Sequence, residues 1–536
     1  MTHIAAEKTV LSEIVILFFV CVLYGAWMVP DVNEVYYVSK AIHFWQPGWI
    51  PDDEFLGGRD SHWTFYALFG WLSFFVSPAA TAWCGRCISW ILLAWSWQRL
   101  SYTLIPLRYA SVLTGLALAY YINNFHEAGE WIIGGVEGKT LAYPFVFFAV
   151  TEMLLCRWNR CFLFLGTASA FHILAGGWAF LIIAVLFIVQ SVKRKNEKGS
   201  GLVKWLPLTF YFLPCAFGLI PALLLDCGTS SETIRQAHQI YCYDRLQHHL
   251  VPYLFPLHFR CRFALLTLIW ICFCRFASSG NDRQRLFDGF IWGTLILAGI
   301  GYAAAYCLSG SREWSAEVLR FYWFRTADIA VPMGVAAGCV SAIHNKKTGQ
   351  SGWIVSLALL ILPLTAVVPQ LEVRCKQTYP RTEPVGISGA VVAPDWYDLC
   401  RWIKTNTAKD VRFWIPRDAT TFKWYAQRSD TGVWKDIPQD AAGVVRWRKA
   451  MNDLFTYKNA NGVLCTDRLL TTLLAEKTPE ELLLLKKEYG FHYVVCLNIP
   501  TTLPAVTPES LPVNPHPALL EPVYSNGTYT LYRFKH

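Results

Sequence analysis

The chain has 536 residues, of which 54% are hydrophobic, 15% aromatic and only 16% charged, whereas an average soluble domain carries about 25% charged residues. This composition excludes a soluble enzyme, a disordered scaffold and a collagen-like fibre. The net charge of +9 would favour nucleic-acid binding only if it formed one patch, but lysine and arginine occur in short clusters between apolar runs. We therefore predict a polytopic membrane protein that binds no nucleic acid.

Apolar runs recur throughout the first 371 residues, and many approach the roughly 20 residues that a spanning helix needs. Because lipid cannot satisfy backbone polar groups, we expect each run to cross the membrane as a helix. Eleven transmembrane helices are predicted, at 12–29, 81–98, 107–123, 139–156, 160–174, 177–192, 203–225, 260–276, 287–308, 327–343 and 353–371.

Two of the apolar stretches do not have the length of one spanning helix. A single helix over residues 160–192 would be longer than the hydrocarbon layer, so the polar break at Phe171-His172 predicts two helices. Residues 63–77 are short and aromatic-rich, and they stop at Ser77-Pro78. This pattern is typical of an interfacial helix that lies on the membrane surface.

The positions of lysine and arginine predict the orientation in the membrane. With a cytoplasmic N-terminus, the short inner loops hold 14 Lys/Arg in 47 residues, whereas the outer segments hold 7 in 122 residues. The higher density inside agrees with the positive-inside rule. Residues 372–536 are therefore expected outside the cytoplasm.

This C-terminal region has a different character from the membrane region. We predict a linker at 372–394 and an α/β domain at 395–536. Thr478-Pro479-Glu480-Glu481 matches a capping box with proline at the first helical position. Residues 491–496 are expected to form a strand, and Asn526-Gly527 is a hairpin signal between two later strands.

The long outer segments divide by charge. The first, 30–80, is rich in acidic groups, and 124–138 adds further carboxylates. The segment 309–326 is basic and aromatic, with Arg320 and Arg325 flanking Phe-Tyr-Trp-Phe. Carboxylates can accept a proton or hold a metal, and arginine can clamp a phosphate. This division suits a reaction between a sugar-like acceptor and a phosphorylated lipid.

One span ends in an acidic loop (Pro30-Asp31-Val32-Asn33-Glu34), and an interfacial segment follows it. A second span has Arg86 near its outer end, and about ten further spans and an external tail come after it. This order of elements resembles the GT-C class of membrane glycosyltransferases. The resemblance implies a GT-C-like transmembrane domain over 1–371. It also implies transfer from a polyprenyl-phosphate or polyprenyl-diphosphate carrier on the non-cytoplasmic face. The expected partners are a lipid-linked sugar donor and membrane lipids, and the expected location is a bacterial inner membrane.

The resemblance places a catalytic acidic residue just after the first span, which maps onto Asp31 or Glu34. Members of the class often carry adjacent acidic residues, whereas these two are three apart, and the tail has no Trp-Trp-Asp motif of the oligosaccharyltransferase kind. The residues expected to bind substrate or lipid phosphate are Arg320, Arg325, His172, Arg59, Asp60, His62, Glu130 and Tyr322. A divalent metal between carboxylates and phosphate is compatible with this chemistry but not required by it, and no metal ligands are predicted.

Several of these residues also have a purely structural interpretation. Asp31 and Glu34 have the spacing of a reciprocal helix cap. Residues 52–54 fit a solvated loop, and Glu127 and Glu130 fit a solvated helical face. Arg320 and Arg325 also suit arginines that extend to the membrane interface, and His172 suits a polar helix break.

Two functions from other classes remain alongside glycosyl transfer. A transporter or flippase of a lipid-linked or small polar substrate would place ionisable groups near mid-membrane and show internal repeats. Charges within the spans are few, and no repeat is evident between the two halves. A non-catalytic membrane scaffold would use its external tail to bind a partner.

Overall fold

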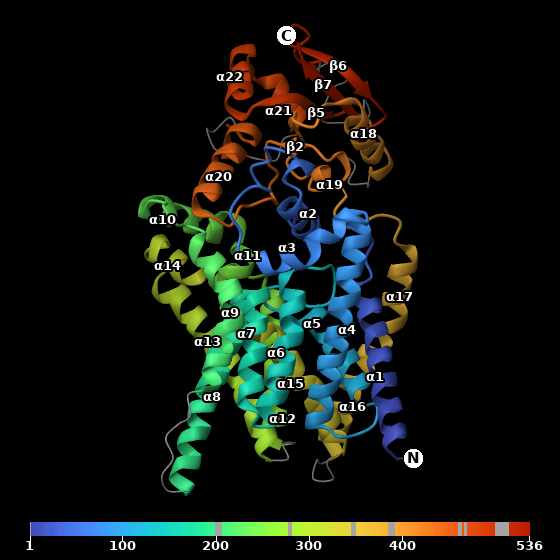
Figure 1. The fold of residues 1–536 in the computed structure, drawn as a ribbon, viewed down its shortest axis with the longest axis vertical. Helices are drawn as coiled ribbons and strands as arrows, with labels where there is room; N and C mark the ends of the chain where they lie inside the picture. Colours follow the sequence, from blue (N-terminus) through green and yellow to red (C-terminus); the bar gives the residue numbers. More distant parts are fainter. Residues whose placement is uncertain are drawn as a thin grey trace.

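The computed structural model describes residues 2–198, 206–276, 281–344, 350–383, 392–458, 464–465, 469–498 and 514–535. A tall bundle of helices stands beneath a smaller domain that contains the C-terminal helices and strands (Figure 1). The N-terminus lies at the lower end of the bundle and the C-terminus at the top of the domain, so the chain ends are at opposite ends of the molecule.

Every predicted span coincides with a helix or a pair of helices. The helices of the bundle are α1 (Thr2–Gly25), α4 (Pro78–Leu104), α5 (Ala110–Phe125), α6 (Gly138–Leu154), α7 (Trp158–Phe171), α8 (Ile173–Lys198), α9 (Leu206–Leu224), α12 (Leu257–Phe276), α13 (Asp282–Cys307), α15 (Arg325–His344), α16 (Gln350–Thr365) and α17 (Val367–Lys376). The break between α7 and α8 falls at His172, which confirms two helices in place of one.

Six of the described helical stretches are long and apolar enough to cross a membrane: Glu7–Gly25, Ile173–Lys193, Leu257–Arg275, Asp282–Cys307, Arg325–His344 and Gly352–Lys376. The protein is therefore a multi-pass membrane protein by this measure, but the predicted count of eleven crossings is not confirmed. Helices α5, α6 and α7 have 16, 17 and 14 residues, fewer than the roughly 20 that span the hydrocarbon layer.

Helix α15 lies at the centre of the bundle. Its span is 83% buried inside the protein, whereas the other five candidate spans are 17–33% buried. It packs against α5, α12, α13 and α16, and the outward faces of surrounding helices carry exposed apolar side chains such as Phe19, Val189 and Leu268. The first residues of α15 therefore lie in the middle of the bundle, at the end that faces the C-terminal domain.

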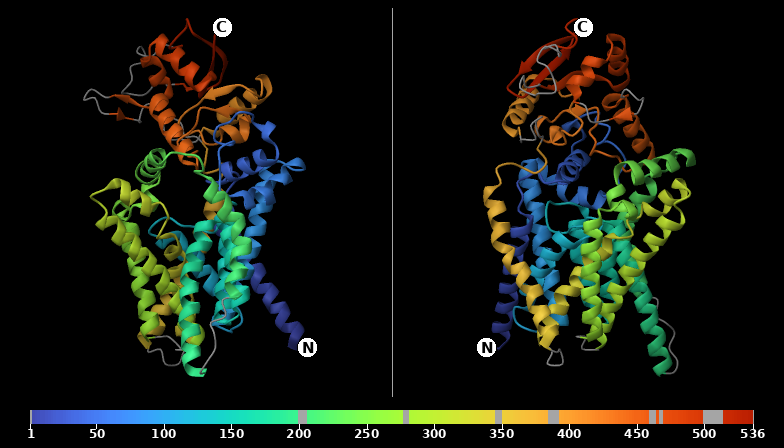
Figure 2. Two further views of the ribbon diagram at one scale, coloured as in Figure 1. Left: turned by 60° about the vertical axis from the view of Figure 1, so that its left-hand side comes forward. Right: turned by 180° about the vertical axis from the view of Figure 1, so that it is seen from behind.

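Short helices cover the outer end of the bundle beneath the C-terminal domain (Figure 2). They are α2 (Glu34–Trp45), η1 (Pro47–Trp49), α3 (Trp63–Phe69), η2 (Gly70–Phe74), α10 (Ser231–Gln239), η3 (Ile240–Arg245), α11 (Gln247–Leu250), η4 (Pro252–Leu254) and α14 (Arg312–Leu319). Helix α2 packs against η2 so closely that a Cβ on Gly70 would lie 1.9 Å from the carbonyl oxygen of Ala41. The predicted interfacial segment 63–77 is thus two short helices, with Phe65 buried and Phe75 exposed.

The C-terminal domain contains the predicted sheet region. Its elements are α18 (Ala393–Asn406), β1 (Arg412–Trp414), α19 (Phe422–Ala426), β2 (Ser429–Asp430), α20 (Ala441–Phe455), β3 (Tyr457–Lys458), β4 (Leu464–Cys465), α21 (Leu470–Glu476), α22 (Pro479–Tyr489), β5 (Phe491–Leu497), β6 (Leu520–Ser525) and β7 (Tyr529–Phe534). The main sheet has the order β2-β1-β5-β7-β6, with β1 parallel to β2 and β5, and β7 antiparallel to β5 and β6.

Local sequence signals in this domain are mostly confirmed. Thr478 and Glu481 form the capping box of α22, which ends at Gly490 with a positive φ of 66°. The hairpin between β6 and β7 forms, but Asn526 and Tyr529 pair across it, so its two turn residues are Gly527 and Thr528. The Asn526 side chain accepts hydrogen bonds from the N–H groups of Thr528 and Tyr529, which shifts the turn by one residue.

A buried ion cluster joins the domain to the first outer segment. The ammonium group of Lys423 lies 2.6 Å from Asp430, 2.8 Å from Asp436 and 3.6 Å from Asp53, and all four side chains are buried. Because Asp53 is buried here, the predicted solvated loop at 52–54 is wrong for that residue. Nearby, Glu54 pairs with Arg412 at 3.1 Å.

Candidate functional site

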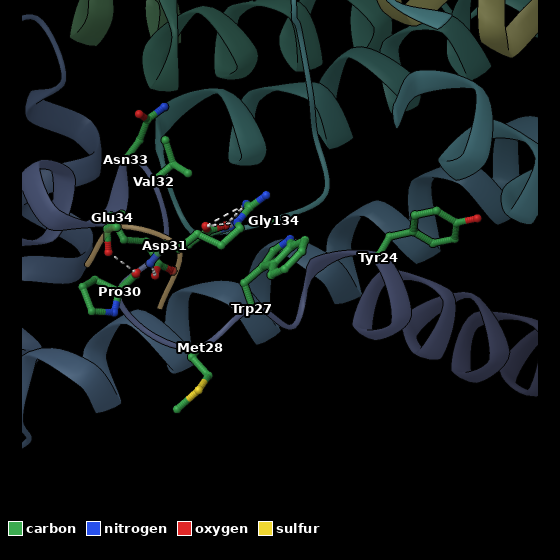
Figure 3. Close-up of polar contacts among 12 residues, drawn as sticks. Tyr24, Trp27, Met28, Pro30, Asp31, Val32, Asn33, Glu34 and Gly134 are labelled. Carbon is green, nitrogen blue, oxygen red and sulfur yellow. Dashed lines mark hydrogen bonds and ion pairs between the residues drawn. The ribbon is translucent and has the colours of Figure 1, made fainter. Parts of the chain in front are cut away.

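Asp31 lies on the segment that leaves α1 and precedes α2 (Figure 3). Its side chain is fully buried. Arg381 donates to Oδ1 at 2.7 Å and to Oδ2 at 3.0 Å, and the N–H of Gly135 donates to Oδ2 at 3.2 Å. The Arg381 side chain is 41% exposed, so the group that covers this carboxylate is itself accessible to solvent.

Glu34 is placed differently, although it is only three residues away. Its two oxygens accept hydrogen bonds from Nε and Nη2 of Arg86, both at 2.6 Å, and from the N–H groups of Val136 and Asp31. Both side chains of the Glu34–Arg86 pair are completely buried. The Glu34 carboxylate therefore has no free position for an acceptor hydroxyl, which favours a structural role.

The predicted reciprocal cap at this position forms only in part. Glu34 accepts from the N–H of Asp31 at 2.8 Å, which is one of the two predicted bonds, but the N-cap residue of α2 is Asn33. The Asp31 side chain does not return the bond, because its oxygens are turned to Arg381 and Gly135. The spacing of the two acidic residues thus fixes the start of α2 and leaves Asp31 for another partner.

A second arginine accompanies Arg381. Arg374, at the end of α17, donates to the carbonyl oxygens of Leu23 and Tyr24 at the end of α1. The guanidinium carbons of Arg374 and Arg381 lie 3.5 and 3.8 Å from the centre of the Trp27 ring. Two arginines stacked at one indole thus stand beside the Asp31 carboxylate. Sequence reasoning missed both, because they belong to the predicted linker.

Arg325, the first residue of α15, lies in a second polar cluster at the outer end of the bundle. Its Nε is 2.9 Å from a carboxylate oxygen of Glu130, and its Nη1 lies 2.9 Å from Nε2 of His172. Since a guanidinium can only donate, this His172 nitrogen is the acceptor. The ring of Tyr322 covers the guanidinium at 4.0 Å. Four predicted binding residues therefore meet here.

His62 and Asp60 extend this cluster toward α2. The rings of His62 and His172 are 5.6 Å apart, and Nδ1 of His62 lies 2.9 Å from Asp60. The other Asp60 oxygen pairs with Lys40 at 2.9 Å. Burial acts to raise the pKa of Asp60, but Lys40 and His62 outweigh burial and hold this pKa below its usual value.

The C-terminal domain reaches the same histidine. Gln439 approaches Nδ1 of His62 at 2.9 Å and accepts hydrogen bonds from the N–H and hydroxyl of Ser61. The cluster therefore receives side chains from the bundle, from the segment between α1 and α4, and from the C-terminal domain. Sequence position gave no signal for Gln439.

Carboxylates of the second outer segment link the two clusters. Lys139 lies 3.5 Å from Glu130 and 3.2 Å from Glu137, and the amide of Asn33 donates to Glu137 at 2.8 Å. Asn33 is the N-cap residue of α2, directly before Glu34. Glu127, Glu130 and Glu137 are all buried, so the predicted solvated face is wrong.

The backbone of this segment is held by α15. The Asp328 carboxylate accepts hydrogen bonds from the N–H groups of Glu127, Ala128 and Glu130 at 2.7–3.1 Å. Burial, reinforced by the charge of Asp328, raises the pKa of Glu127 to about 8. Asp328 thus keeps the segment against the start of α15, and with it the side chain of Glu130.

Two predicted binding residues lie outside these clusters. Arg320 is one-third exposed, lies 3.8 Å from Glu317 and covers the ring of Phe321. Arg59 donates to backbone carbonyls at the end of α9, including that of Cys227 at 2.6 Å. The contacts of Arg320 and Arg325 are therefore separate, and the predicted two-arginine clamp is not assembled in the structure.

Within the described ranges, no group of three or more His, Cys, Asp or Glu side chains is arranged to hold a metal ion. The carboxylates of the two clusters are instead paired with arginine and lysine. The chemistry available at the outer end of the bundle is thus that of carboxylates beside guanidinium groups, which suits proton transfer next to a bound oxyanion.

Comparisons with known proteins give a family match for part of the chain. Residues 394–454 match the model of a domain of unknown function, DUF6798. No curated protein matches the chain.

Solved structures similar to this chain include three from Archaeoglobus fulgidus. One is its oligosaccharyltransferase in complex with zinc and sulfate, at 11% identity and a TM-score of 0.43, covering 91% of this chain and 68% of that one. The apo form has 12% identity, a TM-score of 0.45 and coverages of 91% and 69%. The oligosaccharyltransferase AglB with an inhibitory peptide and a dolichol-phosphate has 12% identity, a TM-score of 0.42 and coverages of 92% and 70%.

Proposed function

We propose that this protein is an integral-membrane glycosyltransferase that transfers a sugar from a polyprenyl-phosphate or polyprenyl-diphosphate carrier to an acceptor on the non-cytoplasmic face. The observation that carries the proposal is the Asp31–Arg381 pair. A buried carboxylate at the outer end of α1 is covered by a partly exposed guanidinium from the chain that leads into the external domain.

The reaction needs both groups. An acceptor hydroxyl attacks C1 of the sugar while the bond from C1 to the phosphate oxygen of the carrier breaks. The hydroxyl proton must leave, and negative charge collects on the departing phosphate. A carboxylate positioned at the hydroxyl takes the proton, and guanidinium groups stabilise the phosphate.

Asp31 is the proposed base, and Arg381 with Arg374 is the proposed phosphate site. In the free protein Arg381 holds both oxygens of Asp31. A phosphate is also a bidentate partner for arginine, so it competes with Asp31 for Arg381. Donor binding would in this way release the carboxylate for the acceptor. Glu34 keeps α2 and Arg86 in place and does not contact substrate in this scheme.

The second cluster is the proposed sugar-binding part of the site. Nε of Arg325 faces Glu130 and Nη1 bonds His172, so among the described contacts Nη2 is the donor that we assign to an oxygen of the substrate. His172, His62, Asp60, Glu130 and Tyr322 fix its position and supply further polar contacts. The positive-inside distribution of lysine and arginine supports the placement of this site on the non-cytoplasmic face.

The test reconstitutes the full chain in proteoliposomes with radiolabelled polyprenyl-phosphate sugars and measures release of the carrier phosphate and labelling of acceptors. Removing a general base costs about 10²–10⁴-fold in rate, so we expect Asp31→Asn to lose at least a hundredfold. Asp52→Asn is the matched control, because it removes one charge from an exposed position in the same outer segment.

Two outcomes would contradict the proposal. Equal transfer rates in the Asp31→Asn variant and the unmodified protein would remove Asp31 from the mechanism. Movement of an intact lipid-linked sugar across the bilayer, with no covalent product under any condition, would support a flippase instead.

A further inference from the structure

Three arginines gather around one tryptophan at the junction of the C-terminal domain and the bundle, and a lysine lies next to them in the chain. The guanidinium carbon of Arg417 lies 4.2 Å from the centre of the Trp434 ring, and those of Arg245 and Arg448 lie 5.8 Å from it. Lys435 follows Trp434 in the chain. Arg245 comes from η3, and the other three cations come from the external domain.

Few carboxylates neutralise these four charges. Arg448 pairs with Asp244 at 3.0 Å, and Arg417 lies 3.8 Å from the exposed Asp418. The other two cations hydrogen-bond to backbone carbonyls, and the carboxylates that act on Lys435, namely Asp31, Asp436 and Glu137, are themselves paired with Arg381, Lys423 and Lys139. Arg245 donates to the carbonyl oxygen of Trp434 at 3.0 Å, and Lys435 donates to that of Val32 at 2.8 Å. The cluster thus has a surplus of positive charge.

The electrostatics of the group agree with this surplus. Burial first, and then the charge of Arg245, lowers the pKa of Lys435 to about 8 against the opposing charges of Asp31, Asp436 and Glu137. The pKa of Arg417 is also lowered, by burial first and then by its basic neighbours Arg448 and Arg245 against the opposing effect of Asp418. The side chains of Arg417 and Arg448 are 23% and 28% exposed, so an anion from solvent can reach them.

The cluster lies directly beside the proposed base. Lys435 binds the carbonyl of Val32, the residue after Asp31, and its ammonium group lies 5.5 Å from the ring of Tyr36. A lipid-linked donor is held from the membrane side by its hydrocarbon chain. Arg417, Lys435 and Arg448 belong to the C-terminal domain, which Figure 1 shows above the bundle, and the partly exposed Arg417 and Arg448 form the side of the proposed site that an acceptor from solvent would meet.

We propose that the cluster of Arg245, Arg417, Lys435 and Arg448 around Trp434 binds the acidic group of an acceptor saccharide, so that the acceptor of this enzyme is an anionic sugar. This assignment rests on the proposed glycosyl transfer and extends it to the acceptor. Several guanidinium groups recognise a carboxylate or phosphate by charge-assisted hydrogen bonds. The partly exposed aromatic rings of Trp434 and Tyr36 supply apolar surface for the sugar ring.

The experiment measures binding to the detergent-solubilised full chain without any donor, by calorimetry with tri-galacturonic acid as the probe. We expect Arg417→Gln/Arg448→Gln to weaken binding about tenfold or more, since hydrogen bonds to charged groups are individually worth about that factor. Arg401→Gln/Arg446→Gln is the matched control, because it removes two exposed arginines of the same domain. The control should bind as the unmodified protein does.

Further probes separate this assignment from its alternatives. Neutral maltotriose should not bind. Equal binding of tri-galacturonic acid by the unmodified protein and the cluster variant would overturn the proposal, as would no binding by either. If the cluster variant loses binding of farnesyl diphosphate more than binding of tri-galacturonic acid, the cluster belongs to the lipid carrier. If the unmodified protein binds tri-glutamate as tightly as tri-galacturonic acid, the cluster binds an acidic peptide. Either result overturns the proposal.

Two features keep the test decisive. Thermal unfolding of each variant shows whether it folds, and Arg448→Gln alone replaces the double variant if that one does not. Because no donor is present, loss of anion binding is independent of transfer. If Asp31→Asn transfers sugar normally while the cluster still binds the probe, the proposed function fails and the anion site stands.

Discussion

Arg381 holds both carboxylate oxygens of Asp31, at 2.7 and 3.0 Å, although the two residues are 350 positions apart in the chain. The pair joins the segment after α1 to the segment that leads from α17 into the C-terminal domain. Its two members differ in exposure, with the carboxylate buried and the guanidinium partly in solvent. Because of this difference in exposure, a ligand can bind Arg381 and draw it away from Asp31.

Arg381→Gln is therefore expected to weaken the donor interaction more than the fold. We predict a rise in KM for the lipid-linked donor of about tenfold or more, because a charge-assisted bidentate contact is lost. Arg381→Lys should recover only part of it, since lysine cannot bind in two-point fashion. Steady-state kinetics in proteoliposomes provide the measurement, and Arg401→Gln is the control. An unchanged KM in the Arg381→Gln variant would contradict this role.

Glu34→Gln should lower stability, whereas Asp31→Asn is expected to lower the transfer rate. The Glu34–Arg86 pair is completely buried, and breaking such a pair costs about 3–5 kcal/mol because it leaves an uncompensated charge. We expect Glu34→Gln to lower the thermal unfolding midpoint markedly, whereas Glu54→Gln, in a pair with an exposed carboxylate, should change it little. Equal midpoints for the two variants would show that the buried pair does not stabilise the fold.

Lys423→Gln should loosen the external domain from the first outer segment. Lys423 is the common partner of Asp53, Asp430 and Asp436, and without it three buried carboxylates face one another. Hydrogen exchange should rise both in the segment around Asp53 and in β2. Lys449→Gln removes a more exposed lysine of the same domain and should leave exchange unchanged. If hydrogen exchange in the Lys423→Gln variant rises only in β2, Lys423 does not connect the domain to the segment around Asp53.

The buried carboxyl group of Glu383 should make the stability of the folded protein depend on pH. Burial raises its pKa to about 7 from an ordinary value of 4.5, against the opposing hydrogen bonds of Tyr425 and Thr421. Because the folded state keeps this proton while the unfolded state loses it, stability from this group is present below about pH 4.5 and is lost as the pH rises to 7. Glu383→Gln stays neutral, so its unfolding midpoint relative to the unmodified protein should increase from pH 5 to pH 8. A constant difference across this range would show that Glu383 does not titrate there.

The sequence predicts the helices of this protein well, because lipid imposes a length and an apolar composition on each of them. The helix break at His172 and the capping box at Thr478 are local signals, and both are found where expected. The number of crossings is less well predicted, since short helices such as α7 are apolar without being long enough to span.

The candidate site is predicted in part. Arg325, His172 and Glu130 were grouped by residue type and outer position, and the structure places them in contact. Arg320 was grouped with them for the same reason, yet its side chain lies beside Glu317. A basic segment between two helices does not specify which of its arginines turns inward.

Partners that lie far along the chain left no local signal. The Arg86–Glu34 pair joins two elements that periodicity describes separately, and Lys423 reaches Asp53 across the boundary between the membrane region and the domain. Acidic residues in a segment between two helices look solvated until the elements that pack against them, here the start of α15 with Arg325 and Asp328, are placed. Burial of Glu127, Glu130 and Glu137 was missed for this reason.

The links between the first outer segment and the external domain set an order for biogenesis. Glu54 and Arg412 are 358 residues apart, so at about 5–20 residues per second the ribosome needs roughly 20 to 70 seconds to deliver the second after the first. Throughout that interval Glu54 and Asp53 are already synthesised while their partners Arg412 and Lys423 are not. Native assembly of the outer end therefore completes only after most of the chain has been synthesised, and a nonsense mutation late in the gene would leave an inserted but unfinished protein.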